Sequence, residues 1–414
     1  MKINRRFFLR NGALAVAGTT AIPSFLVRSV LAQIPTAPNR RLVVIFQRGA
    51  ADGLNIVVPY REKNYYSMRP SIAIPQNQVV DLDGFFGLHP SLASFKPLYQ
   101  QGHLAIVHAV GSPDTTRSHF DAQDYMESGT PGLKSTQDGW LNRALQAEDL
   151  HCNCSHTPFR AVALGADVPR TLAGTVPAIA LNNVNNFAVG GRGPSPSPAA
   201  SAFEAMYGES GDRIFHPAGE ETFEAVKMLR AANPSQYAPS AGVEYPTSEF
   251  GNNMKQIAQL LKANLGVEAA FTDVSGWDTH QNQGNVNGQL ANRLKDFSDG
   301  IAAFWRDLGD SAGNVTLVTM SEFGRTAHEN GTGGTDHGHG NAMFVLGGDV
   351  KGGKVYGRWP GLDNDQLNEG RDLALTTDFR DVLGEVVSHT LGTNNLEMVF
   401  PGARLTPNGF LHLV

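Results

Sequence analysis

Runs of apolar residues alternate with amphipathic segments along most of the chain. The runs have the length of buried strands, and between them apolar side chains recur every three or four positions, which places them on one face of a helix. Strands that alternate with helices predict an α/β fold, in which a largely parallel central sheet has helices on both faces and forms a three-layer domain. The predicted strands are residues 42–46, 104–110, 267–274, 315–320 and 342–346, and the clearest helical stripes lie in residues 250–261 and 290–308.

Polar and glycine-rich loops directly follow these predicted strands. Residues 47–53 come after the first strand, and residues 111–119, 276–280 and 321–325 come after later ones. In a parallel sheet, ligands bind in the crevice outside the carboxyl ends of the strands. We therefore expect these loops to meet at one edge of the sheet and to form a functional site there.

The middle of the chain breaks the alternation. Residues 150–245 are rich in turn-forming residues, and residues 190–198 read Gly-Gly-Arg-Gly-Pro-Ser-Pro-Ser-Pro. Such composition is typical of a mobile loop. We interpret residues 150–245 as a loop-rich insertion or cap within a domain that spans residues 33–414.

Residues 1–32 have the layout of a bacterial export signal. Arg5 and Arg6 precede a weakly apolar stretch, residues 12–27. Paired arginines in this arrangement are typical of the twin-arginine route, which predicts a protein of the periplasm or the extracellular space. An uncleaved anchor is the alternative, but Pro23 interrupts the stretch, and a spanning helix needs roughly 20 apolar residues.

Charge restricts the partners of the mature protein. The signal contains five basic residues and no acidic one, so its removal takes the formal charge from −6 to −11. An acidic chain argues against binding to nucleic acid or to anionic membrane surfaces. A small anionic substrate is a separate prediction, which rests on the candidate arginines and not on the net charge. We expect no integral membrane segment once the signal is removed. Cys152 and Cys154 are the only cysteines, and two residues so close cannot form a disulfide framework.

One loop concentrates metal-ligand chemistry. Asp336, His337 and His339 lie among four glycines within residues 334–340. Carboxylate and imidazole groups are good ligands for divalent metals, and glycine lets the backbone bend so that nearby ligands reach one point. Three ligands so close in sequence rarely make a whole site, so we expect the others from elsewhere in the chain.

Candidates for these other ligands follow predicted strands. They are Asp52, Glu322 and the Asp-x-His pair of Asp278 and His280. Each has a simpler interpretation as a turn or capping residue. The predicted cofactor is a divalent metal ion, with zinc, manganese and calcium as the candidates.

Arg117, Ser118 and Arg325 are the candidates for catalysis. Ser118 precedes a predicted helix, where a serine is most often only an N-cap. The free N–H groups at a helix start also stabilise anions, which makes Ser118 a candidate nucleophile. Arg117 and Arg325 are candidates for holding a phosphate or sulfate group.

Taken together, these motifs resemble a bacterial exported family catalogued as domain of unknown function 1501. The matching segments are residues 46–60, 87–90, 117–121, 276–280, 321–325 and 334–340. They span nearly the whole mature chain, but the family has no established activity to carry over. The wider resemblance is to the alkaline phosphatase and sulfatase superfamily, which implies its α/β sheet and a metal centre at the strand ends.

This wider resemblance implies roles for single residues. Asp52 is similar to the aspartate after the first strand that binds one metal, and Ser118 lies where the nucleophile would open a helix. Asp278 and His280 are similar to ligands of the second metal. Either His337 or His339 is similar to the histidine ligand that comes late in the chain.

Phe323 departs from the pattern of the superfamily. Glu322 and Phe323 stand where an Asp-His pair is expected, which leaves one metal, or a site that has lost catalysis. The favoured hypothesis is a metal-dependent hydrolase of phosphate or sulfate esters. One alternative is a non-catalytic periplasmic binding or assembly protein that keeps the fold with a structural metal or polar cluster. Another is an oxidoreductase with a bound transition metal.

Overall fold

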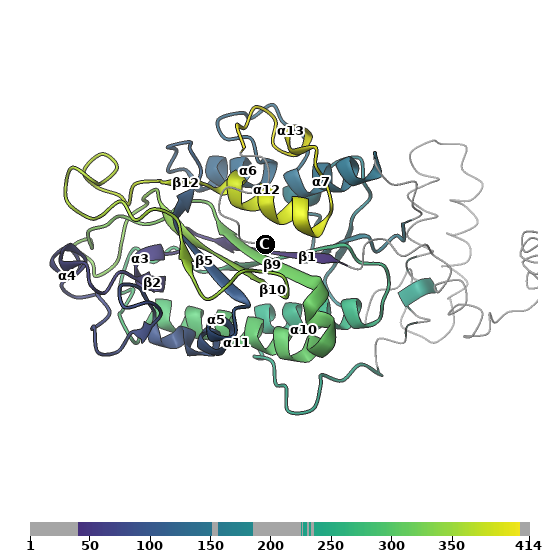
Figure 1. Ribbon diagram of the computed structural model, residues 1–414, viewed down its shortest axis with the longest axis horizontal. Helices are drawn as coiled ribbons and strands as arrows, with labels where there is room; N and C mark the ends of the chain where they lie inside the picture. Colours follow the sequence, from purple (N-terminus) through teal and green to yellow (C-terminus); the bar gives the residue numbers. More distant parts are fainter. Residues whose placement is uncertain are drawn as a thin grey trace, which may run out of the picture.

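A nine-stranded sheet forms the centre of the described chain (Figure 1). The computed structural model describes residues 40–150, 156–184, 225, 227–229, 232 and 236–405. The strands run in the order β11-β5-β10-β9-β1-β8-β6-β7, and β12 pairs with β5. Their bounds are β1 Arg41–Arg48, β5 Leu104–Gly111, β6 Ala161–Leu164, β7 Ile179–Leu181, β8 Ala269–Ser275, β9 Val315–Ser321, β10 Asn341–Gly347, β11 Val355–Tyr356 and β12 Thr377–Asp378.

The direction of the strands brings the predicted loops to one edge. Strand β1 pairs in parallel with β8 and β9, whereas β10 runs antiparallel to both β9 and β5. Strands β1, β5, β8 and β9 therefore all end at the same edge of the sheet, and β10 begins there. The loops after these strands, and the loop that leads into β10, meet at this edge.

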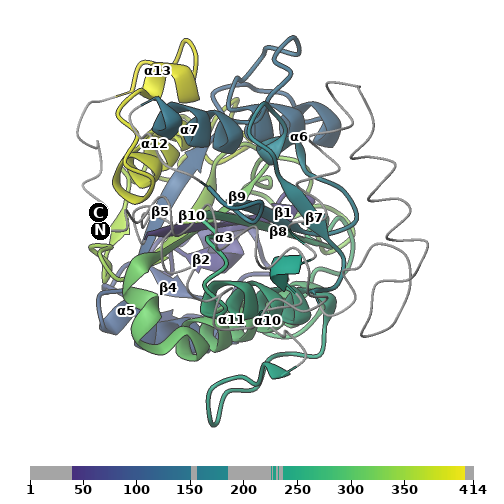
Figure 2. The ribbon, with the colours of Figure 1, turned by 90° about the vertical axis from the view of Figure 1, so that its right-hand side faces the viewer.

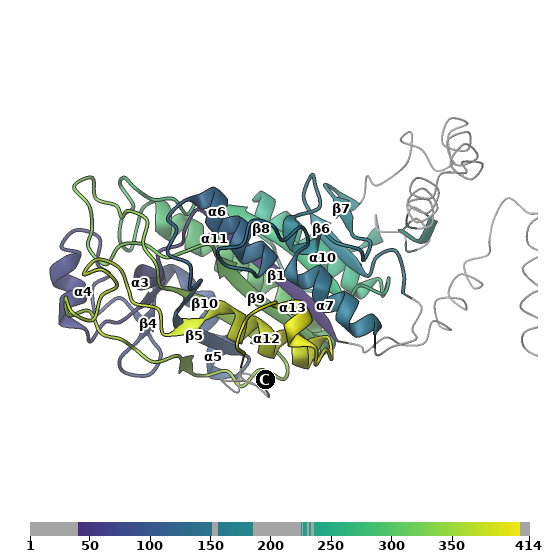
Figure 3. The same ribbon diagram turned by 90° about the horizontal axis from the view of Figure 1, so that it is seen from above.

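Helices cover both faces of the sheet (Figures 1 and 2). Successive side chains of a strand point to opposite faces, and in β1 Val43 and Ile45 enter one core while Val44 and Phe46 enter the other. Helices α5 (Lys96–Gln100), α10 (Glu249–Lys262) and α11 (Gln289–Leu308) cover the first face. Figure 3 looks onto the opposite layer, which contains α6 (His119–Ser128), α7 (Trp140–Asp149), α12 (Phe379–Thr390) and α13 (Leu396–Val399).

These layers confirm the predicted fold class, an α/β domain with a largely parallel central sheet and helices on both faces. The predicted helical stripe at residues 290–308 lies on α11, where its apolar members are buried. The stripe at residues 250–261 lies on α10, and Ser248 caps that helix by accepting a hydrogen bond from Gly251 N at 2.9 Å. Burial of the stripes fixes both helices against the sheet.

A small second sheet packs near the site edge. It has the order β2-β4-β3, with β2 at Val57–Val58, β3 at Val80–Asp81 and β4 at Gly87–Leu88. Two short helices belong to the same part of the chain, α3 at Gly53–Ile56 and α4 at Lys63–Met68.

Strands β6 and β7 arise from the region predicted as an insertion or cap, residues 150–245, and they extend one end of the main sheet. The predicted signal at residues 1–32, the Gly-Pro-Ser stretch at residues 190–198 and the pair Cys152 and Cys154 lie outside the described residues. None of the helices in the described part of the chain has both the length and the apolarity of a membrane span.

Candidate metal centre

Four side chains from three loops converge at the carboxyl edge of the sheet. His119 is the first residue of α6, which follows β5, and Asp278 and His280 follow β8. His337 lies in the glycine-rich loop that leads into β10. Segments more than 200 residues apart in sequence are thus adjacent, since His119 and His337 are separated by 218 positions.

The centre of the cluster is formed by His119, Asp278 and His337. Within the described residues, these three form the one group of His, Cys, Asp and Glu side chains that could hold a metal ion, with ligand atoms within 4.8 Å of one another. The Nε2 atoms of His119 and His337 are 3.0 Å apart. Asp278 Oδ1 is 3.4 Å from His337 Nε2, and Asp278 Oδ2 is 3.5 Å from His119 Nε2.

His280 lies beside this group as a fourth side chain. Its Nε2 lies 3.0 Å from Asp278 Oδ1 and 3.0 Å from His337 Nε2. Ligand atoms about 2 Å from a tetrahedrally coordinated ion are separated by roughly 3.3 Å. The spacings among His119, Asp278 and His337, from 3.0 to 3.5 Å, are therefore close to those of three ligands of one ion.

The outer nitrogen of each imidazole has an acceptor as its partner. His119 Nδ1 lies 2.8 Å from Glu322 Oε1, and His280 Nδ1 lies 3.0 Å from Asp336 Oδ1. His337 Nδ1 lies 2.9 Å from the backbone oxygen of Arg117. Carboxylate and carbonyl oxygens only accept hydrogen bonds, so each Nδ1 carries a proton.

It follows that the cluster presents acceptors to a common point. In the neutral form of each imidazole, the Nε2 atom directs a lone pair inward, and Asp278 adds a carboxylate. Lone pairs and a negative charge facing one another repel unless a proton or a metal ion lies between them. Metal-binding histidines commonly donate their other N–H to a carboxylate or carbonyl in this way, so the donor set fits a divalent ion.

Glu322 and Asp336, both predicted as ligands, lie outside the imidazoles they orient. Burial opposes ionisation of Glu322, but the hydrogen bonds from His119, Gln123 and the Gly49 amide outweigh it and lower its pKa. Burial likewise opposes ionisation of Asp336, and hydrogen bonds from Asn330 and His280 lower its pKa. In this arrangement both carboxylates support histidines and do not belong to the central group.

Arg325, predicted to hold an anionic substrate, instead contacts Asp278. The Arg325 side chain is fully buried, and its Nη1 lies 2.7 Å from Asp278 Oδ1. Burial raises the pKa of Asp278, but the hydrogen bond and positive charge of Arg325 outweigh that effect and the net pKa is lowered. Arg325 therefore keeps Asp278 ionised and fixes its orientation.

Arg117 also has carboxylate partners in place of a free position for substrate. Its Nη2 lies 2.7 Å from Glu369 Oε2 and 2.7 Å from the buried Asp372. The hydrogen bonds to Asp372 and Glu369 raise the pKa of the Arg117 guanidinium. Its backbone oxygen is the acceptor that orients His337.

Ser118 is the N-cap of α6. Its Oγ accepts a long hydrogen bond of 3.5 Å from Asp121 N. This is the simpler of the two roles considered for it, and the role as a nucleophile stays a prediction.

His339, which was predicted as a ligand, is buried, and burial lowers the pKa of its imidazole. The structure places it two positions beyond His337 but not in the central group.

Asp52 is held away from the cluster by a buried ion pair. Arg69 Nη1 lies 2.7 Å from Asp52 Oδ2, and Arg69 Nη2 lies 3.0 Å from Asp52 Oδ1. Gln283 donates a further hydrogen bond of 2.7 Å to Oδ2. A carboxylate engaged in this way by a guanidinium is not available to the ion in this arrangement. Asp52 therefore pairs with Arg69, whereas it was predicted to bind a metal.

Phe323 places an apolar ring where a ligand was expected. Its buried ring lies 5.0 Å from the His119 ring and 5.1 Å from the His337 ring. An apolar ring in this place supports the histidines sterically and adds no ligand. With Asp52 paired to Arg69, the described residues provide one compact donor set.

Glycines let the loops approach one another closely. A Cβ atom on Gly338 would lie 2.3 Å from the backbone of Arg325, and one on Gly334 would lie 2.3 Å from the backbone oxygen of His280. Residues 325 and 337 form an antiparallel β-bridge between the two loops. The glycines are thus needed because the loops pack closely here. The sequence had predicted a different reason, namely that glycine lets the backbone bend.

His119 is the functional residue that sequence reasoning missed. The candidates at this helix start were Arg117 and Ser118, although His119 is an imidazole at the end of a strand-end loop. That position after β5 was the available signal. The helix start pointed to Ser118, whereas the side chain that reaches the cluster belongs to the next residue.

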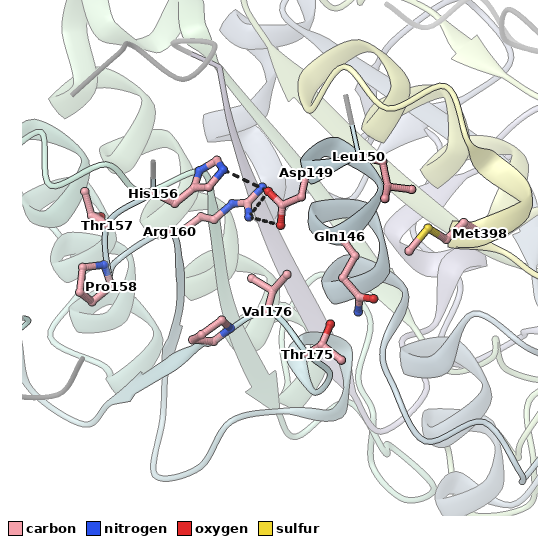
Figure 4. Close-up of a pocket in the computed structure, with 11 residues that line it drawn as sticks. Gln146, Asp149, Leu150, His156, Thr157, Pro158, Arg160, Thr175, Val176 and Met398 are labelled. Carbon is pink, nitrogen blue, oxygen red and sulfur yellow. Dashed lines mark hydrogen bonds and ion pairs between the residues drawn. The ribbon is translucent and has the colours of Figure 1, made fainter. Parts of the chain in front are cut away.

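A separate pocket lies at the opposite, amino-terminal edge of the sheet (Figure 4). It has a volume of about 590 Å³, and its lining includes Asp149, His156 and Arg160. These side chains are already joined by ion pairs: Arg160 Nη1 lies 2.7 Å and His156 Nε2 lies 3.1 Å from Asp149 Oδ1. The pocket shares no lining residue with the metal cluster, so the two are distinct.

The fold and the cluster together define an α/β protein with a candidate metal centre at the carboxyl edge of its sheet. The chain belongs to the family described as Protein of unknown function (DUF1501), whose model matches residues 39–395. This finding confirms the family resemblance of the sequence motifs. A comparison with curated proteins found no match.

Several solved structures are similar to the chain at low identity. Wild-type alkaline phosphatase PafA shares 12% identity with a TM-score of 0.33, and the match covers 70% of this chain and 64% of that one. The PsFucS1 sulfatase from Pseudoalteromonas sp. shares 11% identity with a TM-score of 0.37 over 92% and 74% of the two chains. The C-terminal periplasmic domain of EcEptC from Escherichia coli shares 12% identity with a TM-score of 0.37 over 90% and 88%.

Proposed function

We propose that the chain is an exported, metal-dependent hydrolase of phosphate or sulfate esters. The observation that carries the proposal is the convergence of the His119 and His337 Nε2 atoms and the Asp278 carboxylate, with His280 Nε2 3.0 Å from His337 Nε2 beside them. A divalent ion held there supplies Lewis acidity toward an ester oxygen and lowers the pKa of water. His119, His337 and Asp278 would hold the ion, and His280 lies beside them.

The cluster is accessible, which suits a catalytic role. The side chain of Asp278 is 43% exposed and that of His280 is 38% exposed. Catalytic metal sites keep one position open to water or substrate, whereas structural sites are closed by their ligands. An ion held by these side chains would face solvent on one side.

Arg371 is the cation best placed to meet an anionic ester. Its guanidinium donates to the backbone oxygen of His337, and its side chain is 41% exposed. Arg371 Nε lies 3.4 Å from Asp372 Oδ1, whereas Arg117 and Arg325 form shorter ion pairs of 2.7 Å with carboxylates. An arginine at the rim of the cluster would bind the non-bridging oxygens of phosphate or sulfate.

The test measures metal content and ester turnover on the same samples. We expect about one zinc or manganese ion per chain, with hydrolysis of aryl phosphates or aryl sulfates. The double variant Asp278→Ala/His337→Ala should lose both. The matched control is Asp349→Ala/His389→Ala, which removes a surface Asp–His pair with a 3.2 Å contact and should keep both.

A non-catalytic role for the ion is the second candidate. It is favoured by the ion pairs that occupy Arg117 and Arg325 and by the apolar ring of Phe323. A bound ion without turnover of any ester in the panel would support this role and refute the hydrolase. Absence of metal from the wild-type protein would refute both.

A further inference from the structure

The side chain of Gln123 connects the metal cluster to the end of strand β1. It lies on α6 four positions after His119, so the two side chains share one face of the helix. Glu127 lies a further four positions along the same face. This face of α6 is directed toward the loops that follow β1 and β9, because Gln123 contacts both Arg48 and Glu322.

Two contacts fix the orientation of the Gln123 amide. Arg48 Nη1, which can only donate, lies 3.1 Å from Gln123 Oε1. Gln123 Nε2 lies 2.9 Å from Glu322 Oε1, which can only accept when ionised. If the amide were flipped, its NH2 group would face the Arg48 donor and its oxygen would face the Glu322 acceptor. Only one orientation therefore satisfies both neighbours.

Arg48 is itself held by acidic residues. Its Nη1 lies 2.9 Å from Glu127 Oε1, and its Nε lies 2.5 Å from Asp273 Oδ2. These ion pairs anchor the guanidinium, and with it the oxygen end of the Gln123 amide.

The other end of the amide acts on the partner of a metal-binding histidine. Glu322 Oε1 accepts hydrogen bonds from Gln123 Nε2 at 2.9 Å, from His119 Nδ1 at 2.8 Å and from Gly49 N at 2.8 Å. Glu322 is 1% exposed, so solvent cannot replace a donor that is lost. Removal of the Gln123 donor would leave Gly49 N and Ser321 Oγ as the other restraints on Glu322 and would weaken its orientation toward His119.

We propose that Gln123 is a positioning residue for the ion, because its amide orients Glu322 and thereby directs the Nε2 lone pair of His119 into the cluster. This inference rests on the ion binding in the proposed function. It adds a residue that contacts neither the central point nor a substrate. Partners of metal-binding histidines typically change metal affinity by about 10- to 100-fold when they are mutated.

The test compares zinc affinity, measured by competition with a chelating dye, across matched variants. Gln123→Met keeps the length of the side chain but removes both polar ends. Gln123→Glu keeps the acceptor toward Arg48 and places a negative charge beside Glu322. Both should bind zinc at least about 10-fold more weakly than the wild type.

Asp124→Asn is the control, since Asp124 is the next residue on α6 and pairs with Arg170 at 2.9 Å. It should bind zinc within about twofold of the wild type. Cobalt(II) replaces zinc in a parallel experiment, because its visible absorption depends on ligand geometry. We expect a changed cobalt spectrum in the Gln123 variants and an unchanged one in Asp124→Asn.

The outcomes separate this inference from the proposed function. Wild-type zinc affinity and cobalt spectra in both Gln123 variants would overturn the role of Gln123 and leave the metal site intact. Equal loss of affinity in Asp124→Asn, with unaltered cobalt spectra throughout, would also overturn it, because the effect would then come from the helix as a whole. A wild-type protein that binds no zinc would overturn both proposals.

Discussion

The partner of each imidazole decides what its residue does in this protein. His119 faces a buried glutamate, His280 an exposed aspartate and His337 a backbone oxygen. All three partners select the same tautomer, although they differ in charge and burial. A carboxylate near such a site is therefore either a ligand or the support of a ligand, and sequence alone does not distinguish the two.

Asp52 provides a direct test of that distinction. In Asp52→Asn, the buried Arg69 loses its charged partner, and loss of one member of a buried pair typically costs about 3 kcal/mol or more. We expect a marked fall in the free energy of unfolding, measured by urea titration, with the zinc content unchanged. The control Asp349→Asn alters an exposed pair with Arg40 and should change stability little. A loss of zinc in Asp52→Asn would instead restore Asp52 as a ligand.

His108 makes stability depend on pH. Burial lowers its pKa from 6.5 to about 4, an effect partly opposed by the hydrogen bond to the Val57 oxygen. Its Nδ1 accepts from Ala109 N at 2.8 Å, so protonation would place two donors face to face. The folded state therefore resists a proton that the unfolded chain accepts. The contribution of His108 to stability is complete above pH 6.5 and declines as pH falls toward about 4.

The expected loss between pH 7 and pH 5 is about 2 kcal/mol. Urea titrations at the two pH values should show this loss in the wild type. The variant His108→Gln lacks the titrating group and should lose correspondingly less. If the difference in unfolding free energy between the two proteins is the same at both pH values, His108 does not titrate as described.

At the scale of elements, the strands and helices could be predicted, but the assembly of the site could not. Apolar runs and stripes are periodic signals, and they located β1, β5, β9 and α11 within a few residues. The strand-end rule then placed the candidate loops at one edge. Which side chains meet depends on loop packing, however, and no period encodes that packing. For this reason Asp278 and His337 were predicted while His119 was not.

Close packing between loops makes Gly338 a sensitive position. In Gly338→Ala, the new Cβ would lie 2.3 Å from the Arg325 backbone. The β-bridge between residues 325 and 337 must then open. We expect zinc affinity to fall by at least about 10-fold and stability by about 1–3 kcal/mol. The control is Gly331→Ala, because a Cβ there meets nothing within 4 Å. Equal behaviour of the two variants in zinc titration and thermal unfolding would contradict this packing role.

At the scale of the whole molecule, one ion would join loops from distant parts of the sheet. His119 follows β5, Asp278 follows β8 and His337 precedes β10. Since these loops come together only in the folded chain, an ion bound there stabilises the folded state selectively. The free energy of unfolding should then depend on the concentration of free metal.

The choice of metal follows from the same donor set. Zinc and manganese accept imidazole nitrogen, whereas calcium prefers six to eight oxygen ligands. A donor set with two or more imidazoles and one aspartate therefore favours zinc or manganese and disfavours calcium. Of the three candidate ions, zinc should bind most tightly, in keeping with its higher affinity for nitrogen ligands than that of manganese.

Thermal and urea unfolding over a series of free-metal concentrations test both points together. At 100 times its dissociation constant, zinc should stabilise the wild type by about 2.7 kcal/mol, and each further tenfold increase should add about 1.4 kcal/mol. Calcium at the same free concentrations should have little effect. The double variant Asp278→Ala/His337→Ala should show no dependence on zinc, because two members of the central group are gone. If zinc stabilises this variant as much as the wild type, the ion binds elsewhere and the three loops do not share it.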